Sequence, residues 1–271
     1  YRKIINFFPR LMMCGQVSDP IFNKNFPEFV KMSKEKDIEL GVHTAASHKP
    51  IKWYEDIFDS FGKGYWIFGI DGLPKDSHKY RINQDGEKLF EIAKMCRKKG
   101  IDTKWQYIVF RYNENDIEEA KNIALDNGME FELTSSSRWD ENDPYRPINP
   151  KYQIDKTKDY VKKIKRDLKN WYPICITRTG PTKKAYGHNV SGHLMPCCWC
   201  FKTNDPDINV LNQEHLKIEN VDSIEEIVLS DEWLKFTNTL ANDPLNAPKT
   251  CWKYCGKGKG YAIKKHETYE A

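Results

Sequence analysis

Apolar and polar positions follow two alternating patterns over the first half of the chain. Short apolar runs, typical of buried strands, cover part of 4–13 and then 38–44, 65–70, 105–110 and 130–133. Between them, apolar residues recur at i, i+3 and i+4, which predicts helices from Asn25, over 51–61, over 86–99 and from Asn115. Capping-box spacing marks two of these starts, Asn25 with Glu28 and Asn115 with Glu118.

This alternation predicts βαβ units, a parallel sheet and right-handed crossovers, and therefore an α/β fold. Ligands of such sheets and barrels bind at the carboxyl ends of the strands. Unusual residues gather there: 14–20 follow the first strand, Thr44 ends the second, Asp71 and Gly72 follow the third, and Gln106 lies within the fourth. Turn formation explains Gly, Ser, Asp and Pro at such places equally well, so both interpretations stay open.

The C-terminal part of the chain carries a different signal. Six of the eight cysteines occur from Cys175 onward, among apolar and aromatic residues. Cys251 and Cys255 would share one turn, and an extended 195–201 would place Cys197 toward Cys175 and turn Cys198 and Cys200 to the other side. Four thiolates from Cys175, Cys197, Cys251 and Cys255 suit either a zinc ion or an iron-sulfur cluster, and spacing does not choose between them.

Composition narrows the class of protein. The net charge of +4 over 271 residues is too small to imply by itself that the protein binds nucleic acid or a membrane surface. No apolar run is long enough for a membrane span and the first residues lack a signal-peptide layout, so we expect a cytoplasmic protein with reduced thiols.

A polar, proline-containing connector over 136–151 precedes a predicted basic helix over 160–171, and 174–177 is strand-like. Cys96 is expected to be core packing.

Taken together, these motifs resemble the radical SAM family with a short SPASM or twitch type C-terminal extension. Residues 14–20, Cys-Gly-Gln-Val-Ser-Asp-Pro, take the place of the family's Gly-Gly-Glu-Pro segment, with Asp19 for glutamate. Thr44-Ala45-Ala46 is similar to the Thr-Asn-Gly at the next strand end, and 68–73 with His78, Tyr80 and Arg81 resembles the fourth strand and its loop. Cys175, Gly192-x4-Cys197 and Cys251-x3-Cys255 resemble the one-cluster form of the extension.

The resemblance implies a partial (β/α)6 TIM-like barrel over 1–140, a connector and basic helix over 141–172, and a cysteine-rich module over 173–271. It implies that S-adenosylmethionine is bound by Gly15, Ser18, Asp19, Pro20, Thr44, Asp71 and Gln106. An auxiliary 4Fe-4S cluster would be held by Cys175, Cys197, Cys251 and Cys255. The implied reaction is hydrogen abstraction by a deoxyadenosyl radical, with a peptide or protein as substrate and a flavodoxin or ferredoxin as electron donor.

One departure from the family matters. The Cys-x3-Cys-x2-Cys loop that binds the cluster cleaving S-adenosylmethionine is absent from these 271 residues. We therefore expect an N-terminally truncated chain that lacks the first barrel strand, with the second 4Fe-4S cluster found only in the full-length protein and with the fragment inactive by itself. The alternatives are a small-molecule or sugar-modifying radical SAM enzyme and a non-catalytic zinc module that contacts nucleic acid through Lys183, Lys184 and His188.

Overall fold

The computed structural model describes residues 2–14, 18–136, 139–140, 142–153, 166–177, 186–189, 191–200, 205–256 and 266–270. The chain divides into two compact units. The first, here called the barrel unit, comprises Arg10–Tyr160 and Lys264–Ala271, and the second, the thiol unit, comprises Tyr1–Pro9 and Val161–Ile263. The first residues of the chain therefore belong to the thiol unit, and the last residues belong to the barrel unit.

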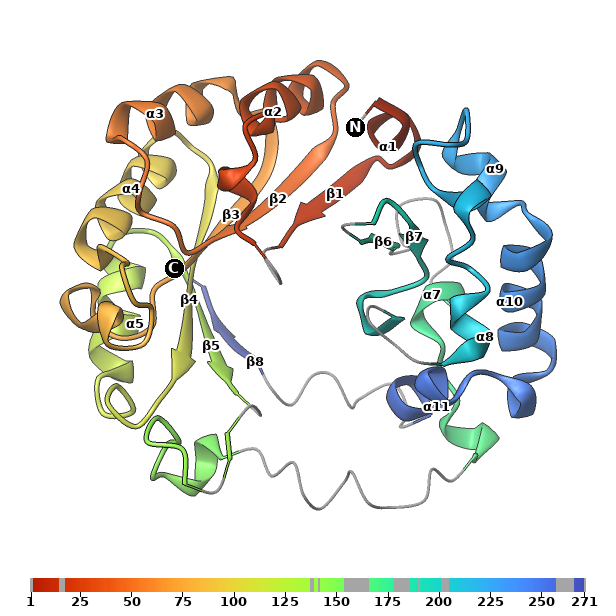
Figure 1. Cartoon of the computed structure of the whole chain (residues 1–271). Coiled ribbons are helices and arrows are strands. Elements are labelled where there is room, and N and C mark those ends of the chain that lie inside the picture. The colour runs from red at the N-terminus through yellow and green to blue at the C-terminus, as the bar shows by residue number, and fades with distance from the viewer. Residues whose placement is uncertain are drawn as a thin grey trace. The chain divides into compact units, whose positions relative to one another are not determined.

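The barrel unit is built on one six-stranded sheet (Figure 1). Its order follows the chain and ends with a C-terminal strand: β1 (Arg10–Met13), β2 (Glu39–Thr44), β3 (Lys63–Gly69), β4 (Asp102–Val109), β5 (Glu130–Ser135) and β8 (His266–Tyr269). Neighbours among the first five strands are parallel, whereas β8 pairs antiparallel with β5. The parallel α/β sheet expected from the sequence is confirmed, and β8 is an addition that the sequence pattern did not indicate.

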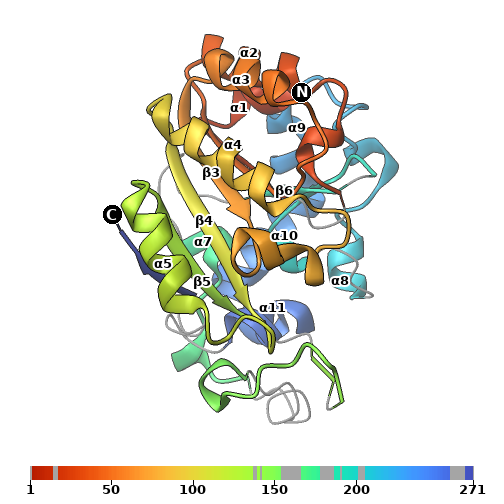
Figure 2. The ribbon, with the colours of Figure 1, turned by 90° about the vertical axis from the view of Figure 1, so that its left-hand side faces the viewer.

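Four helices cover one face of this sheet, as Figures 1 and 2 both show: α2 (Phe26–Glu35), α3 (Ile51–Ser60), α4 (Gly86–Lys98) and α5 (Ile117–Asp126). Strand β4 shows how the sequence separates the two faces, because Trp105 and Tyr107 are buried while Lys104 and Gln106, which alternate with them, are partly exposed. Trp66 of β3 and Phe131 of β5 add to the same buried layer. The face that carries Lys104 and Gln106 is called the inner face below.

The sequence predicts where helices start less accurately than it predicts their interiors. Asn25 precedes α2 as expected, but its side chain makes no capping hydrogen bond. The second expected box is wrong: α5 begins at Ile117 after Asp116, so Asn115 and Glu118 are not at the capping positions. Helix α4 has a true cap, since the Asp85 carboxylate accepts from the backbone N–H of Lys88 at 2.9 Å.

The thiol unit consists of short helices around buried aromatic residues. Its α-helices, over the residues that the structure describes, are α1 (Arg2–Phe7), α7 (Ile174–Thr177), α8 (Pro206–Asn209), α9 (Ile224–Val228), α10 (Asp231–Asn242) and α11 (Lys249–Cys255), and β6 (Gly187–His188) pairs antiparallel with β7 (Leu194–Met195). Trp233 and Trp252 are fully buried. Ser223 and Glu226 form a capping box at the start of α9.

Short 3-10 helices occur in both units. In the barrel unit they are η1 (Pro20–Phe22), η2 (Pro74–Lys79) and η3 (Pro150–Tyr152), and in the thiol unit η4 (Leu168–Asn170), η5 (Cys198–Cys200), η6 (Glu214–Leu216) and η7 (Pro244–Asn246). Half of the predicted basic helix over 160–171, residues 160–165, lies outside the described residues, and in the described half Leu168–Asn170 is the 3-10 helix η4. None of the described helices is both long and apolar enough to cross a lipid bilayer.

One strand expectation is confirmed in part and one is wrong. Part of the apolar run 4–13 is the expected strand, β1, although none of its residues is buried. The run begins with helix α1, which was not expected, because the apolar period of so short a run does not distinguish helix from strand. Helix α1 then joins the thiol unit, where the Lys3 ammonium donates to the backbone carbonyl of Ile218 at 2.9 Å. The strand-like 174–177 is the single helical turn α7, which the preceding Pro173 is well placed to start.

Candidate functional site

The carboxylate of Asp19 joins the ends of β1 and β2. Its two oxygens lie 3.0 and 2.9 Å from the Thr44 hydroxyl, which donates to them, and the backbone N–H of Ala45 donates to Oδ2 at 2.8 Å. The same carboxylate caps η1 by accepting from the backbone N–H of Ile21 at 3.2 Å. The structure thus brings together two of the residues singled out from the sequence, Asp19 and Thr44, at the carboxyl edge of the sheet.

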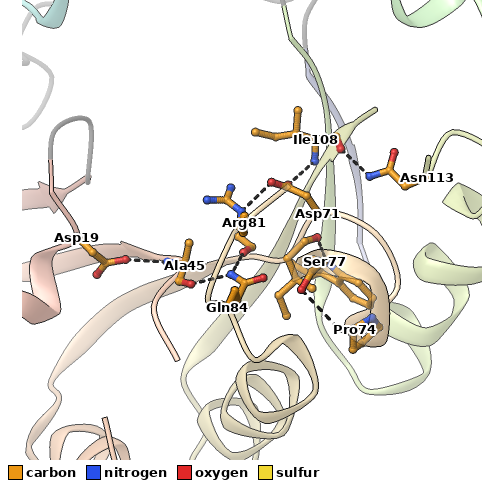
Figure 3. A network of polar contacts seen from close by, with 12 residues as sticks. Asp19, Ala45, Asp71, Pro74, Ser77, Arg81, Gln84, Ile108 and Asn113 are labelled. Atoms are coloured by element: carbon orange, nitrogen blue, oxygen red, sulfur yellow. Dashed lines mark hydrogen bonds and ion pairs between the residues drawn. The ribbon is translucent and has the colours of Figure 1, made fainter. Parts of the chain in front are cut away.

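Gln84 continues this network to β3. Its Nε2 donates to the carbonyls of Ala45 at 2.6 Å and Gly69 at 2.9 Å, which ties the ends of β2 and β3 together (Figure 3). Gln84 is 8% exposed, and its Oε1 is a buried acceptor without a hydrogen-bond partner in the described structure. Sequence reasoning missed Gln84 because it lies in the loop before α4 and belongs to no apolar pattern of a strand or helix.

Asp71 and Arg81 form a buried ion pair at the ends of β3 and β4. The Asp71 carboxylate is fully buried, lies 2.7 Å from Arg81 Nε and accepts from the backbone N–H of Ile108 at 3.0 Å (Figure 3). Burial raises the pKa of Asp71, and Arg81 and the Ile108 N–H oppose that rise. A Cβ at Gly69 would come within 3.0 Å of the Arg81 guanidinium, so glycine makes room for it.

Asp71 therefore holds Arg81 at the sheet edge, and the Arg81 side chain is the partly exposed member of the pair, at 25%. Tyr112 supports the same corner by donating its hydroxyl hydrogen to the Asp71 carbonyl. The resemblance to a known loop drew attention to Arg81, but the sequence alone did not indicate the pairing with Asp71.

The inner face next to this edge is polar and partly charged. Gln106 Nε2 donates to Glu132 at 3.3 Å, and Lys104 pairs with Glu130 at 2.7 Å. His43 of β2 shares this face, and burial lowers its pKa, with Glu132 opposing and Lys104 adding to the shift. His43 Nε2 is a buried nitrogen without a hydrogen-bond partner among the described residues. The face therefore offers donors and acceptors to a polar ligand.

The remaining predicted cofactor residues have simple placements. Ser18 is exposed directly before Asp19, and Pro20 is the first residue of η1. Gly15 lies outside the described residues. Asp19, Thr44, Asp71 and Gln106 thus belong to one strand-end region, with direct contact between Asp19 and Thr44 only.

In the thiol unit, five cysteines converge. Cys197 Sγ and Cys200 Sγ are 3.6 Å apart, Cys200 is hydrogen-bonded to Cys251, and Cys175 interacts electrostatically with Cys197 and Cys255. Cys251 and Cys255 are four residues apart on α11 and therefore on one helix face. All four of the predicted ligands, Cys175, Cys197, Cys251 and Cys255, belong to this group.

The expected separation of Cys197 from Cys200 is wrong. It assumed an extended chain over 195–201, but strand β7 ends at Met195 and Cys198–Cys200 is the 3-10 helix η5. Side chains three residues apart along a 3-10 turn lie on the same side. Cys200 is consequently a fifth candidate ligand, whereas nothing is described for the side chain of Cys198.

These thiols are costly to ionise where they are. Burial and the neighbouring Cys197 and Cys255 raise the pKa of Cys175 to about 12. The hydrogen bond with Cys200, together with burial, raises the pKa of Cys197, which the backbone N–H groups of Trp199 and Cys200 partly oppose. For Cys200, the bond with Cys197 lowers the pKa, but Cys251 and burial outweigh it. A bound metal would supply the positive charge that stabilises neighbouring thiolates.

The thiol geometry bears on the choice of metal. A tetrahedral zinc with Zn–S bonds of about 2.3 Å has sulfurs about 3.8 Å apart, close to the 3.6 Å between Cys197 and Cys200. However, no three His, Cys, Asp or Glu side chains in the described part of the chain are arranged to hold a single ion. A 4Fe-4S cluster spreads its four thiolates over four irons. The cysteines therefore suit either kind of centre by residue type, but those in the described part of the chain do not form a single-ion site.

Comparison with known proteins extends the description of the fold. No protein-family model and no curated protein matches the chain. Among solved structures, SuiB from Streptococcus suis bound to S-adenosylmethionine is similar over 82% of this chain and 56% of its own, at 11% identity and a TM-score of 0.53. SuiB bound to its precursor peptide SuiA is similar over 92% of this chain and 60% of its own, at 12% identity and a TM-score of 0.53.

The chain has the radical SAM fold. The partial barrel expected from the resemblance is confirmed at this level, and identities of 11% and 12% establish likeness of fold alone. The chain spans 56% and 60% of the lengths of the two SuiB chains.

Proposed function

We propose that this chain is the S-adenosylmethionine-binding barrel and auxiliary-cluster part of a radical SAM enzyme that modifies a peptide. The observation that carries the proposal is the Asp19–Thr44–Ala45 network at the strand ends of a fold shared with a protein that binds S-adenosylmethionine. Ligands of parallel sheets bind at this edge.

The residues at this edge fit the cofactor in charge and position. Asp19 offers a carboxylate for the cofactor's amino group, and its bonds with Thr44 and Ala45 hold it in one orientation. A carboxylate has about four acceptor positions, so these bonds leave capacity for a further donor. Arg81, held by Asp71, is suited to the cofactor's carboxylate, and Gln106 to its polar ring or ribose atoms. Gly15, Ser18 and Pro20 would shape the loop around them.

When bound and reduced, S-adenosylmethionine supplies a carbon radical that abstracts hydrogen from substrate. The chain's own part is to bind and orient the cofactor and to keep water from the inner face. Because the Cys-x3-Cys-x2-Cys loop is not among these 271 residues, we propose that this chain alone does not cleave the cofactor.

The thiol unit would hold one auxiliary 4Fe-4S cluster. We propose Cys175, Cys197, Cys251 and Cys255 as its ligands, with Cys200 as a neighbour able to replace Cys197. Cys175 and Cys251 are buried, as is Trp252, and Cys197 and Cys255 are partly buried, which supports a centre largely shielded from water. The cluster's role would be to relay electrons or to anchor the substrate.

A peptide substrate is supported by the likeness to SuiB bound to SuiA, and a small molecule or sugar remains the alternative substrate class. A second candidate function, a zinc-stabilised module without catalysis, is favoured by one observation, the 3.6 Å between Cys197 and Cys200 sulfurs. Metal analysis separates the two functions.

Binding of S-adenosylmethionine tests the proposal. Equilibrium dialysis with labelled cofactor should show binding to the anaerobically purified chain, and Asp19→Asn should weaken it about tenfold, because a charge-assisted hydrogen bond contributes about 1.5 kcal/mol or more. The matched control is Asp37→Asn, which removes an equally charged but exposed carboxylate of the same unit. A wild-type chain that does not bind, or an Asp19→Asn variant that binds equally well, would contradict the proposal.

A further inference from the structure

A pair of stacked aromatic rings, one exposed and one partly buried, lies at the thiol cluster. The rings of Trp199 and Tyr254 are 4.2 Å apart between centroids and 11° from parallel. Trp199 is 53% exposed, whereas Trp233 and Trp252 of the same unit are only 1% exposed. A large aromatic ring left in water on a surface is typical of a contact site for another molecule.

Both rings are attached directly to the thiol cluster. Trp199 stands between Cys198 and Cys200 in η5, and Tyr254 directly precedes Cys255 in α11. The backbone N–H of Trp199 also hydrogen-bonds to Cys197 and favours its thiolate. The pair therefore connects the buried sulfurs to the surface through a few covalent bonds and one hydrogen bond.

Helix α11, which carries Tyr254, is basic. Its residues 249–255 include Lys249 and Lys253 and no Asp or Glu. The Lys253 ammonium lies 5.2 Å from the centre of the Tyr254 ring, a cation–π distance, and Lys249 is exposed at the start of α11. The nearby acid Asp205 is engaged by backbone N–H groups of Asp207 and Thr250. The surface therefore favours an acidic partner.

We propose that Trp199, Tyr254 and the lysines of α11 form the docking surface for an acidic electron-transfer protein that reduces the auxiliary cluster. The inference rests on the proposed function and adds the place where reductant and chain meet. In each encounter the carrier is oxidised by one electron and the cluster is reduced by one, with no bond formed or broken. Opposite charges would steer the encounter and the Trp199 ring would seat it.

Stopped-flow mixing with a reduced acidic flavodoxin tests this surface, because the flavin absorbance reports electron loss independently of enzyme turnover. Trp199→Leu should slow the oxidation of the flavodoxin about tenfold, equal to about 1.4 kcal/mol of lost contact, and Trp199→Phe should recover much of the rate. Lys249→Gln with Lys253→Gln should lower the rate at low salt and flatten its salt dependence. Lys235→Gln, an exposed lysine on α10, is the charge-matched control and should change neither.

Iron and sulfide analysis of every variant keeps the outcomes distinct. Wild-type iron in Trp199→Leu with a slowed reaction supports the docking surface. Wild-type iron with an unchanged rate overturns the docking surface and leaves the proposed function intact, and a chain without iron overturns both. Binding of a labelled single-stranded oligonucleotide that is lost in Trp199→Leu, with no effect on flavodoxin oxidation, would assign the surface to nucleic acid instead and overturn the proposal.

Discussion

Replacing Asp71 by Asn is the sharpest test of how the strand-end region is held together. The substitution keeps an acceptor for the Ile108 N–H but removes the charge that lies 2.7 Å from Arg81 Nε. Two unit charges about 4 Å apart attract by about 4 kcal/mol at an effective dielectric constant of about 20. Because the Arg81 side chain is 25% exposed, water screens part of this attraction and can solvate Arg81 in the variant. We therefore expect a loss of about 2 to 3 kcal/mol in the free energy of unfolding.

Urea titration of the full chain, followed by circular dichroism and tryptophan fluorescence, measures this loss as a lower midpoint at an unchanged slope. The control is Asp37→Asn, which breaks an ion pair with Lys63. Because the side chains of Lys63 and Asp37 are 50% and 85% exposed, this substitution should lower the free energy of unfolding by about 0.5 kcal/mol or less. Combining Asp71→Asn with Arg81→Gln should cost less than the sum of the two single changes. An Asp71→Asn variant as stable as Asp37→Asn would refute the reasoning.

Three further predictions concern single contacts. Thr44→Val should cost about 1 to 2 kcal/mol in urea titrations by leaving the Asp19 carboxylate without its hydroxyl donor, whereas Thr44→Ser should be close to wild type; equal losses would contradict this. Burial lowers the pKa of His43 in the folded chain. Below pH 6.5, the ordinary pKa of histidine, protonation therefore favours the unfolded state, and the free energy of unfolding should rise as pH increases from 5 to 7. The wild-type minus His43→Gln difference in urea midpoint should carry that rise, and a flat difference would exclude it. Ser223→Ala should lower stability by about 1 kcal/mol by removing a helix cap, and an unchanged thermal midpoint would show that the cap contributes nothing.

Much of the barrel unit follows from the sequence because its strands are buried on one face and its helices are amphipathic. Strands β2 to β5 and helices α3 and α4 each carry a clear apolar period and end at a recognisable residue, and such signals are local. Over the apolar run 4–13 the sequence predicted the strand that is β1 but not helix α1, because each of these elements is too short to establish a period.

Non-local contacts explain what the sequence could not show. Strand β8 is His-Glu-Thr-Tyr, a polar segment whose partner β5 lies more than a hundred residues away, and only the pairing makes it a strand. The ion pair of Asp71 with Arg81 and the bridging role of Gln84 likewise depend on loops that meet in space.

The candidate sites divide in the same way. Cys251 and Cys255 were predictable because four residues make one helical turn, and Asp19 with Thr44 because parallel strands end at one edge. Cys200 was assigned to the wrong side because a single 3-10 turn replaces the extended backbone that alternation assumes.

The most direct test of the central claim is the metal content of the chain after anaerobic purification, by iron, zinc and acid-labile sulfide analysis with a Mössbauer spectrum. We predict a brown protein with about four irons and four sulfides per chain, lost when Cys251 and Cys255 are both replaced by Ser. A colourless chain with one zinc and no sulfide would contradict the account.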